Sequence, residues 1–378
     1  MKQKLMFLYL KTGGGHLSPA KSVAQWIEKN YGDTNEVDLV DGFTGVQPLV
    51  KLIVEDGYRK SQEKARWVFE GLYAIHKIKP IAHLSGILVS KFVRPILEKK
   101  ILCDKPDKIV IFHFFLIKPV NEIIKKHQLK TPVLIVVTDP FTAHPIWFLD
   151  KQQNFIIFSQ LLKNQLIKVN NISPKKIHTF PFILNEKFSS RLANEMKESI
   201  RIKYDIPKES KVIMIMGGAD GIPRGGKILK KLLNSDIKVH ILIVCGRNSN
   251  LFESAHELKR TYNAEHLSVF GFIDYVYELL NVSDLVITKC GASTFMEVLM
   301  CGKIPIINSY LWEQEKGNVD FICENQLGLY EKNVSRIPFV IKSIMQSSTE
   351  FDFYRSNIDR MGLINGTSQV SEFILQFS

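Results

Sequence analysis

The segment from Asp284 to Asn318, DLVITKCGASTFMEVLMCGKIPIINSYLWEQEKGN, constrains the fold more than any other part of the chain. It begins with a short apolar run at 285–287, which is typical of a buried strand. A glycine turn at 291–294 and a helical pattern follow. A second apolar run at 304–307 then leads into a polar loop at 313–318. This order predicts a strand–helix–strand unit of a parallel sheet.

The same alternation runs through the rest of the chain. Short apolar runs, each followed by a turn or a polar group, occur at 5–10, 109–112, 132–137, 155–158, 177–180, 212–216, 239–244 and 267–270, and residues 36–41 are expected to form another short strand. Parallel strands end at one edge of a sheet, so these turns should gather at ligand-binding edges. A chain of 378 residues exceeds what one core usually supports. We therefore expect an α/β fold of two doubly wound domains, at 1–185 and 186–350, with a helix at 351–378.

The first turn places a histidine at such an edge. Gly13 to Gly15 follow the first apolar run and precede His16. Ser18 and Pro19 are typical of a helix N-cap and first helical residue. Neither the G-x-G-x-x-G nor the G-x-x-x-x-G-K-[ST] spacing is present, so the turn does not favour a nicotinamide or P-loop site.

Glu297 admits two interpretations. The turn that begins at Gly291 leads into a helix whose free N–H groups favour an anion such as phosphate, and Glu297 would then belong to a ligand site. Alternatively, Thr294-x-x-Glu297 is a capping box, in which Glu297 bonds back to the helix start for structural reasons alone. With the polar loop at 313–318 on the same edge, the first interpretation describes a nucleotide-sugar pocket.

Composition narrows the partners and the compartment. The net charge of +12, from 50 Lys and Arg against 38 Asp and Glu, favours an anionic partner. The five cysteines are scattered and form no C-x-x-C, which disfavours zinc and redox motifs and suits a reducing cytoplasm. The amino terminus is typical of a strand and not of a signal peptide. No apolar stretch approaches the ~20 residues that span a bilayer.

Residues 43–105 differ from the rest in being both basic and aromatic. They hold twelve Lys or Arg against six Asp or Glu, a net charge of +6. Basic amphipathic helices with Trp and Phe are typical of a contact with an anionic membrane surface. The alternative is a solvated helical face whose apolar side is buried in the core. Nucleic-acid binding is disfavoured, because no recognised motif is present and the basic excess lies beside apolar aromatics.

The order and spacing of several short motifs resemble one family, the diacylglycerol glycosyltransferases. This group contains monogalactosyldiacylglycerol synthases and bacterial diacylglycerol glucosyltransferases, and is distantly related to the peptidoglycan N-acetylglucosaminyl transferase. The motifs span nearly the whole chain: GGGH at 13–16, TDP and HPIW within 138–147, a glycine turn at 217–221, VCGRN at 244–248, GFID at 271–274, ITKCGAST..E at 287–297 and QEKGNV at 314–319.

The resemblance implies a GT-B fold, in which two Rossmann-like domains flank a cleft and a C-terminal helix often crosses back to the first domain. It implies inverting transfer from a UDP-sugar without a metal or other cofactor, and the chain contains no D-x-D motif for a divalent ion. His16 would be the general base, and its free pKa of ~6.5 would suit that role. Asp139 is placed with it in the catalytic group, and His113, His144 and Trp147 on the acceptor side. For His113 alone, a satisfied core position is the commoner explanation.

The remaining assignments concern the donor. Glu297 would accept from the ribose hydroxyls, Gln314 and Glu315 would hold the hexose, and Gly271 and Phe272 would hold the uracil. The glycine turns and Arg247 would neutralise the diphosphate. The residues assigned to the UDP-sugar are Gly14, Gly15, Gly217, Gly218, Arg247, Gly271, Phe272, Gly291, Ala292, Ser293, Thr294, Glu297, Gln314, Glu315 and Asn318.

The expected function is transfer of a hexose, glucose more than galactose, from its UDP conjugate to diacylglycerol. The expected location is peripheral, on the cytoplasmic face of the cell membrane. Leu17, where many relatives have Arg, and Glu313, where Gly is usual, leave the sugar and the acceptor open. The alternatives are another lipid acceptor, such as a polyprenyl-linked sugar, and a non-catalytic module that binds UDP-sugar.

Overall fold

The computed structural model describes residues 2–11, 14–46 and 79–378. Residues 47–78, which make up half of the basic aromatic region at 43–105, lie outside the described part. The chain divides into two compact units. Unit 1 is Met1–Glu186 together with Asn365–Ser378, and unit 2 is Lys187–Ile364.

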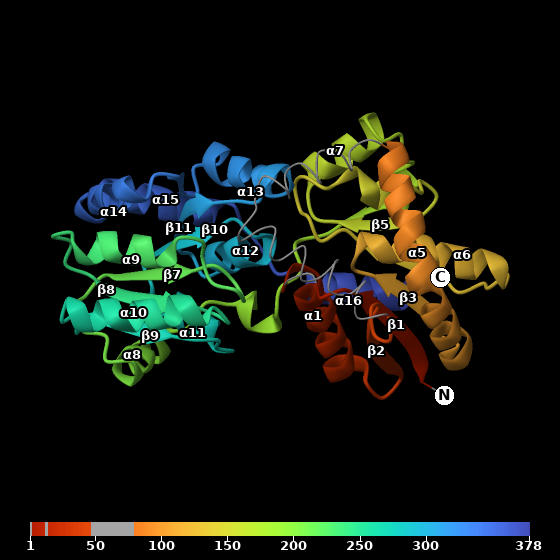
Figure 1. Ribbon diagram of the computed structural model, residues 1–378, viewed down its shortest axis with the longest axis horizontal. Helices are drawn as coiled ribbons and strands as arrows, with labels where there is room; N and C mark the ends of the chain where they lie inside the picture. The colour runs from red at the N-terminus through yellow and green to blue at the C-terminus, as the bar shows by residue number, and fades with distance from the viewer. Residues whose placement is uncertain (1, 12–13, 47–78) are drawn as a thin grey trace. The chain divides into compact units, whose positions relative to one another are not determined.

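Unit 1 is built on a six-stranded parallel sheet with the order β2-β1-β3-β4-β5-β6 (Figure 1). Strand β1 lies between β2 and β3, where its Leu8 pairs with Val40 of β2 and with Ile111 of β3. Both faces of the sheet are covered, so its central strands are nearly continuous apolar runs, whereas the edge strand β2 alternates apolar and acidic residues. The strands are β1 (Gln3–Tyr9), β2 (Asn35–Asp41), β3 (Lys108–Ile111), β4 (Val133–Val136), β5 (Asn154–Ile157) and β6 (Ile177–Thr179).

Helices cover both faces of this sheet. Right-handed crossovers place the helix after β1 on one face and those after β2, β3 and β5 on the other. The first of these packs beside the C-terminal helix α16, and α5 packs beside α6. The helices are α1 (Gly14–Tyr31), α5 (Lys79–Asp104), α6 (Ile117–Lys126), α7 (Gln160–Lys168) and α16 (Thr367–Gln376), with short 3-10 turns at η2 (Phe114–Leu116), η3 (Pro145–Phe148) and η4 (Pro174–Lys176).

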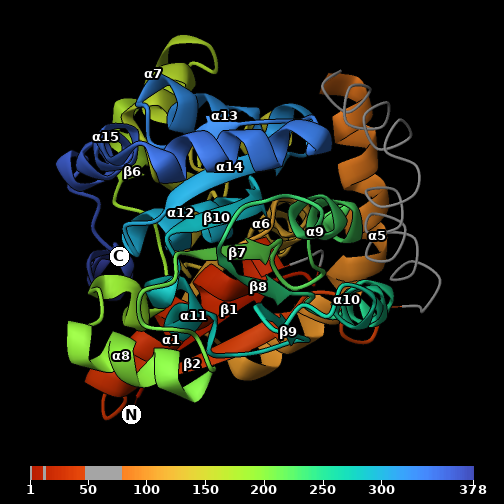
Figure 2. The ribbon, with the colours of Figure 1, turned by 90° about the vertical axis from the view of Figure 1, so that its left-hand side faces the viewer.

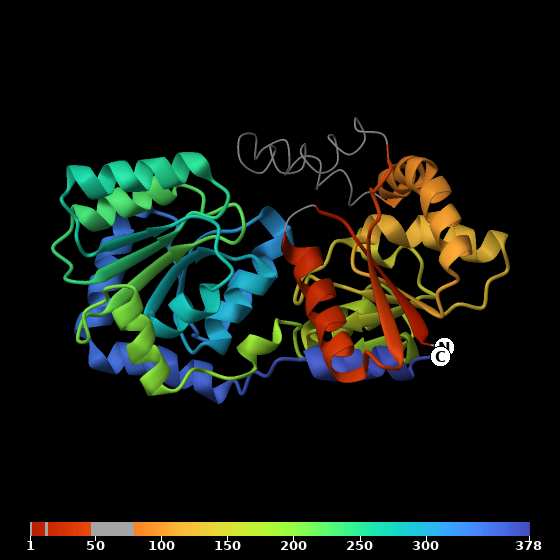
Figure 3. The ribbon, with the colours of Figure 1, turned by 90° about the horizontal axis from the view of Figure 1, so that it is seen from below.

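The C-terminal helix α16 is an integral part of unit 1. Figure 3 shows it, in blue, beside α1, in red. Val370 and Ile374 are fully buried. At its start, the Thr367 hydroxyl donates to the Leu184 carbonyl (2.5 Å). At its end, the Lys108 ammonium donates to the Ile374 carbonyl (3.0 Å) and to the Leu375 carbonyl, where a cation is favoured by the helix dipole.

Unit 2 contains a second six-stranded parallel sheet, with the order β12-β11-β10-β7-β8-β9. Here too the strands are short apolar runs, and Val212 to Ile215 are fully buried. The strands are β7 (Val212–Met216), β8 (His240–Val244), β9 (Leu267–Phe270), β10 (Leu285–Lys289), β11 (Ile304–Ser309) and β12 (Leu329–Tyr330).

The helices of unit 2 also cover both faces. Figure 2 shows α9 and α10 on one side of β7, β8 and β9, and α8 and α11 on the other. The sequence prediction of a doubly wound α/β fold with two sheets is therefore confirmed. The helices are α8 (Asn194–Lys203), α9 (Gly225–Leu233), α10 (Ser249–Thr261), α11 (Val276–Val282), α12 (Ala292–Met300), α13 (Trp312–Glu324), α14 (Ile337–Gln346) and α15 (Ser348–Arg360), with 3-10 turns at η5 (Glu186–Ser189), which begins at the unit boundary, and η6 (Val334–Arg336).

Several predicted helix limits were wrong. Helix α1 begins at Gly14, so Ser18 and Pro19 lie inside it and not at its start. Helix α12 begins at Ala292 directly after Gly291, so the predicted turn is one residue long. The predicted polar loop at 313–318 is the first part of helix α13. In the C-terminal region, the single helix expected over 351–378 is two helices, of which α15 belongs to unit 2 and α16 to unit 1.

Candidate active site

In unit 1, two histidines flank the point where the strand order reverses. Strand β1 has β2 on one side and β3 on the other, so the chain leaves β1 and β3 in opposite directions. Ligands of doubly wound sheets bind at the carboxyl edge at this point. His16 lies in the first turn of α1 after β1, and His113 follows β3. Their ring centroids are 4.4 Å apart.

Two oxygen atoms lie at hydrogen-bond distance from one ring nitrogen of His16. Its Nδ1 is 2.8 Å from the Phe112 carbonyl oxygen and 2.9 Å from the Thr138 hydroxyl oxygen. A carbonyl oxygen can only accept, so the Nδ1 atom carries a hydrogen when it bonds to Phe112. In the neutral ring the Nε2 atom then has the lone pair, and it is the atom that can accept a proton.

The pKa of His16 differs from the expected value. Only 8% of the residue is exposed, and burial lowers its pKa to about 4, although the hydrogen bond to Phe112 raises it. The prediction of a pKa near the free value of ~6.5 was therefore wrong, because the sequence does not reveal how much of the ring is buried. At neutral pH the ring is uncharged and has a lone pair available.

The other acceptor-side residues predicted in unit 1 lie in the same group of rings. The ring centroids of Trp147 and His16 are 6.2 Å apart. Phe114 packs edge-on against Trp147, with 5.4 Å between the ring centroids. Phe114 also stacks on His144, at 6.5 Å. Asp139 is buried and accepts a hydrogen bond from the Trp147 indole N–H (3.0 Å). In the described part of the chain, the side chain hydrogen-bonded to His16 is that of Thr138 and not that of Asp139.

In unit 2, the predicted donor residues follow the carboxyl ends of five adjacent strands. The turn from Gly217 to Gly221 follows β7, and its first and last glycines have no room for a side chain. A Cβ atom on Gly217 would lie 2.2 Å from the Gly221 carbonyl oxygen, and Gly218 has a positive φ of 77°. Its backbone approaches the first turn of α12, because a Cβ atom at Gly218 would lie 3.5 Å from the Thr294 hydroxyl. The Gly217–Gly221 turn and the start of α12 thus lie close together where the strand order reverses, between β7 and β10.

Glu297 does not form a capping box. Gly291 is the N-cap of α12 without a side-chain cap, and Thr294 is the third residue inside the helix, so that interpretation was wrong. Glu297 makes no hydrogen bond within the described residues. Burial raises its pKa to about 7, although the Lys187 ammonium opposes the shift. A partly buried carboxyl group that has no hydrogen-bond partner among the described residues suits a ligand with hydroxyl groups.

The first turns of α13 contribute the other polar groups. Glu315 is buried, and its carboxylate accepts from the backbone N–H of Leu311 (2.6 Å), the N-cap residue of α13. The glutamate that bonds back to the start of its own helix is therefore Glu315 and not Glu297. The same side chain lies 3.6 Å from the position of a Cβ on Gly291. Asn318 donates to the Cys290 carbonyl (2.9 Å). Gln314 is partly buried in the same helix.

Three buried polar atoms around residues 290–293 have no hydrogen-bond partner among the described residues. They are the Ser293 hydroxyl, the Ser309 hydroxyl and the amide oxygen of Asn318. The Ser309 carbonyl accepts from the Cys290 N–H (3.0 Å), so these atoms surround the N-terminus of α12. Unsatisfied buried polar atoms are costly, and a bound polar ligand would satisfy them.

Arg247 and Phe272 form the far end of this edge. The guanidinium carbon of Arg247 lies 4.6 Å from the centroid of the Phe272 ring, which is 57% exposed. The two residues follow the neighbouring strands β8 and β9. An exposed aromatic ring with a cation beside it suits a ligand that has a flat, polar ring, because that ring can stack on the aromatic side chain.

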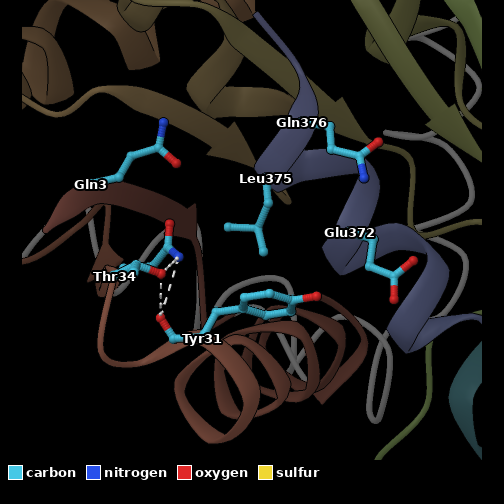
Figure 4. Close-up of a pocket in the computed structure, with 7 residues that line it drawn as sticks. Gln3, Tyr31, Thr34, Glu372, Leu375 and Gln376 are labelled. Carbon is cyan, nitrogen blue, oxygen red and sulfur yellow. Dashed lines mark hydrogen bonds between the residues drawn. The ribbon is translucent and has the colours of Figure 1, made fainter.

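A surface pocket of unit 1 lies away from these residues. Figure 4 shows it between the start of β1, the end of α1 and the end of α16, with Tyr31, Leu375 and Gln376 among the residues that line it. Gln3 and Thr34 are at the amino-terminal edge of the sheet, opposite to the edge that holds His16. The pocket is therefore separate from the histidine site.

Sequence reasoning missed four contributors to the two edges. Thr138 stands beside Asp139 in the TDP motif, and its position directly after a buried strand was the signal that could have identified it. The Phe112 carbonyl and the Ser309 hydroxyl could not be found from the pattern, because the role of each depends on tertiary contacts. Asn308 is fully buried and accepts from the Arg224 guanidinium (3.0 Å), which ties the β11 edge to the turn before α9.

Two structural absences concern the described part of the chain alone. No three His, Cys, Asp or Glu side chains of the described residues gather as ligands for a metal ion. Nor does any of the described helices combine the length and apolar character that crossing a bilayer requires.

Comparison with known proteins identifies both units. Residues 16–181 match the model of monogalactosyldiacylglycerol synthase, and residues 212–326 match the model of the glycosyltransferase family 28 C-terminal domain. A processive diacylglycerol β-glucosyltransferase from Bacillus pumilus is 24% identical over 377 residues, covering 100% of this chain and 95% of the relative. A probable monogalactosyldiacylglycerol synthase from Nicotiana tabacum is 22% identical, covering 90% and 64%.

Solved structures agree on the fold. MurG from Acinetobacter baumannii has a TM-score of 0.60 and 13% identity over 100% of both chains. HepE from Anabaena in complex with UDP-glucose also has a TM-score of 0.60 and 13% identity, over 99% of this chain and 98% of that one. These likenesses show the GT-B fold. Since one family model covers most of unit 1 and the other most of the unit 2 sheet, the chain belongs to the monogalactosyldiacylglycerol synthase group of glycosyltransferase family 28 and is a hexosyltransferase.

Proposed function

We propose that this hexosyltransferase transfers glucose, in preference to galactose, from its UDP conjugate to diacylglycerol with inversion at the anomeric carbon. The observation that carries the proposal is the buried, uncharged His16, whose hydrogen bond at Nδ1 leaves Nε2 free to take a proton. The names of the relatives support a diacylglycerol acceptor. The UDP-glucose complex of HepE, which has the same fold, supports the donor class.

The proposed step is a single displacement. The acceptor hydroxyl oxygen forms a bond to C1 of the hexose while the bond from C1 to the UDP oxygen breaks. His16 Nε2 takes the hydroxyl proton, and UDP leaves with the electron pair. His113, His144 and Trp147 bind the acceptor around the reacting hydroxyl, and Asp139 acts by orienting the Trp147 indole.

Unit 2 would hold the donor. The N-terminus of α12 and the Gly217–Gly221 turn present backbone N–H groups to the diphosphate, and Arg247 adds a positive charge. Glu297 accepts from the ribose hydroxyls. The uracil stacks at Phe272 beside Gly271. The hexose contacts Gln314, Glu315 and Asn318, whose amide oxygen has no other hydrogen-bond partner among the described residues.

A membrane surface would deliver the acceptor. Diacylglycerol is confined to bilayers, so the enzyme must approach one. The described part of the basic aromatic region includes α5, on which Leu88 is 54% and Phe92 42% exposed next to Lys91. Exposed apolar side chains flanked by basic ones favour binding to anionic lipid. A Phe92→Glu variant should bind vesicles containing anionic lipid less tightly than the wild type, while Phe353→Glu, at an exposed aromatic of unit 2, should not.

Product analysis tests the proposed reaction. The purified protein is incubated with UDP-glucose or UDP-galactose and diacylglycerol in anionic liposomes, and the lipids are analysed by mass spectrometry and NMR. A β-linked glucosyl diacylglycerol is the expected product. An α-linked product would contradict inversion, and transfer to a different lipid in a total extract would favour the alternative acceptor. UDP-sugar binding without transfer to any lipid would favour a non-catalytic module.

A further inference from the structure

The Nδ1 atom of His16 has two oxygen partners but at most one hydrogen. The Phe112 carbonyl oxygen lies 2.8 Å away and the Thr138 hydroxyl oxygen 2.9 Å away. A hydroxyl can donate or accept, whereas a carbonyl can only accept. The carbonyl therefore decides the role of the hydroxyl.

We propose that Thr138 is a positioning residue, whose hydroxyl oxygen accepts the Nδ1 hydrogen of His16 together with the Phe112 carbonyl and so keeps the lone pair on Nε2. The proposal rests on the proposed function, in which Nε2 takes the proton of the acceptor hydroxyl. Thr138 itself is 3% exposed and lies two residues after the end of β4, whereas Phe112 directly follows β3. Two neighbouring strands of the sheet thus hold the ring of His16.

The opposite arrangement is unfavourable. If the Thr138 hydroxyl donated to Nδ1, that atom would carry a lone pair. The Phe112 carbonyl oxygen would then face this lone pair at 2.8 Å with no hydrogen between them. The proton of the neutral ring would be on Nε2, which could no longer act as the base. The two arrangements therefore differ in both tautomer and chemistry.

The two arrangements also affect the pKa of His16 in opposite directions. An acceptor at Nδ1–H stabilises the charged ring most, so it raises the pKa, whereas a donor to the Nδ1 lone pair stabilises the neutral ring and lowers it. Among the described residues, the titratable group in contact with the ring is His113, whose own pKa is lowered by burial and by His16. The carboxylate of Asp139, the residue next to Thr138 in the sequence, accepts a hydrogen bond from the Trp147 indole N–H. The sign of a change at Thr138 thus reports on the hydroxyl itself.

The experiment uses the full-length protein labelled with ¹⁵N-histidine, with His16 assigned by its loss in His16→Gln. The wild type at neutral pH should show a protonated Nδ1 and an unprotonated Nε2. In Thr138→Val, which keeps the shape and loses the hydroxyl, the pKa of His16 should fall by about one pH unit. Thr138→Ser should restore the wild-type value. Thr131→Val is the matched control, since Thr131 precedes β4 at the other edge and donates to the Pro106 carbonyl (3.3 Å).

Kinetics provide the second readout. In Thr138→Val, kcat/KM should fall about tenfold and its acid limb should move to lower pH, whereas Thr138→Ser and Thr131→Val should keep wild-type values. An Nε2–H tautomer in the wild type, or a pKa that rises or stays unchanged in Thr138→Val, would overturn the proposal. The tautomer and the pKa are measured without substrate. A protein with the expected tautomer but no transferase activity would therefore refute the proposed function and not the role of Thr138.

Discussion

Loss of contact with water shifts the pKa values of His16, the proposed base, and of Glu297, the proposed ribose ligand. It lowers the pKa of His16 to about 4 and raises that of Glu297 to about 7. Both shifts favour the neutral form, because a charge that is shielded from water loses part of its hydration. At neutral pH His16 is an uncharged base, and Glu297 is divided between its two protonation states.

This division makes donor binding depend on pH. In the proposed site the ribose hydroxyls donate to the Glu297 carboxylate, so UDP should bind the ionised form of Glu297 more tightly. Between pH ~6 and pH ~8 the affinity for UDP should therefore rise about tenfold, with release of a proton on binding. Isothermal titration calorimetry in buffers of different ionisation enthalpy measures both quantities. Glu297→Gln is the control. Its affinity for UDP should still change with pH through the titration of the UDP phosphate, but the part of the pH dependence that is due to Glu297 should be lost.

At the scale of elements, the first turn of α1 combines two glycines with open space. A Cβ atom on Gly14 or Gly15 would meet no atom within 4 Å, and neither residue has a positive φ. Neither packing nor backbone conformation therefore requires glycine there. The open backbone beside His16 is what a closely approaching substrate would need.

Gly15→Ala should therefore separate stability from activity. Alanine in a helix is more favourable than glycine by up to about 1 kcal/mol, so the melting temperature should rise or stay constant. The new methyl group would occupy the space beside His16, so kcat/KM should fall. Calorimetry and transfer assays measure the two effects. A variant with full activity would show that this space is not used, and one with a lower melting temperature would contradict the open surroundings.

The C-terminal helix α16 permits a matched test of unit 1. Ile374 is fully buried in unit 1, whereas Ile364, just before the chain returns to that unit, is 54% exposed. Ile374→Ala should destabilise the protein by about 2–5 kcal/mol, the usual cost of such a buried truncation. Ile364→Ala should cost less than about 0.5 kcal/mol. Equal effects in urea denaturation would show that α16 does not contribute to the core.

How far the sequence predicts structure depends on whether a feature is local. Buried parallel strands show as short apolar runs, and all the runs from Leu5 to Ile307 are strands. Helix starts were less predictable. Ser18 and Pro19 have the chemistry of a helix start, but α1 begins four residues earlier. The polar run after Tyr310 has the composition of a loop but forms the start of α13, because the buried contacts of Glu315 and Asn318 arise only in the folded protein.

At the scale of the whole molecule, the buried histidines should make the protein sensitive to acid. Their folded pKa values lie below the unfolded value of 6.5, so the unfolded chain binds more protons and stability is lost as the pH falls from ~6.5 toward ~4. His16 alone should contribute about 3 kcal/mol. In unit 2, the lowered pKa of His240 causes a similar loss of stability in acid. The raised pKa of Glu297 has the opposite effect, because the stability that it contributes is present in acid and is lost as the pH rises through ~7.

Unit 1 should therefore lose more stability in acid than unit 2. Urea denaturation of a Trp312→Phe variant, whose remaining tryptophans all belong to unit 1, measures that unit at each pH. Far-ultraviolet circular dichroism follows both units together. The His16→Gln variant should lose part of the acid sensitivity of the unit 1 transition. If His16→Gln were as acid-sensitive as the wild type, the burial of the neutral ring would not control stability.

The rate of hexose transfer to diacylglycerol by His16→Ala tests the proposed chemistry most directly. Loss of a general base typically reduces turnover by about 10²- to 10⁴-fold. We expect kcat to fall by that factor with an unchanged Kd for UDP, because the residues proposed to hold the donor belong to unit 2. Full turnover by His16→Ala, with the same product and the same affinity for UDP, would contradict the assignment of His16 as the base.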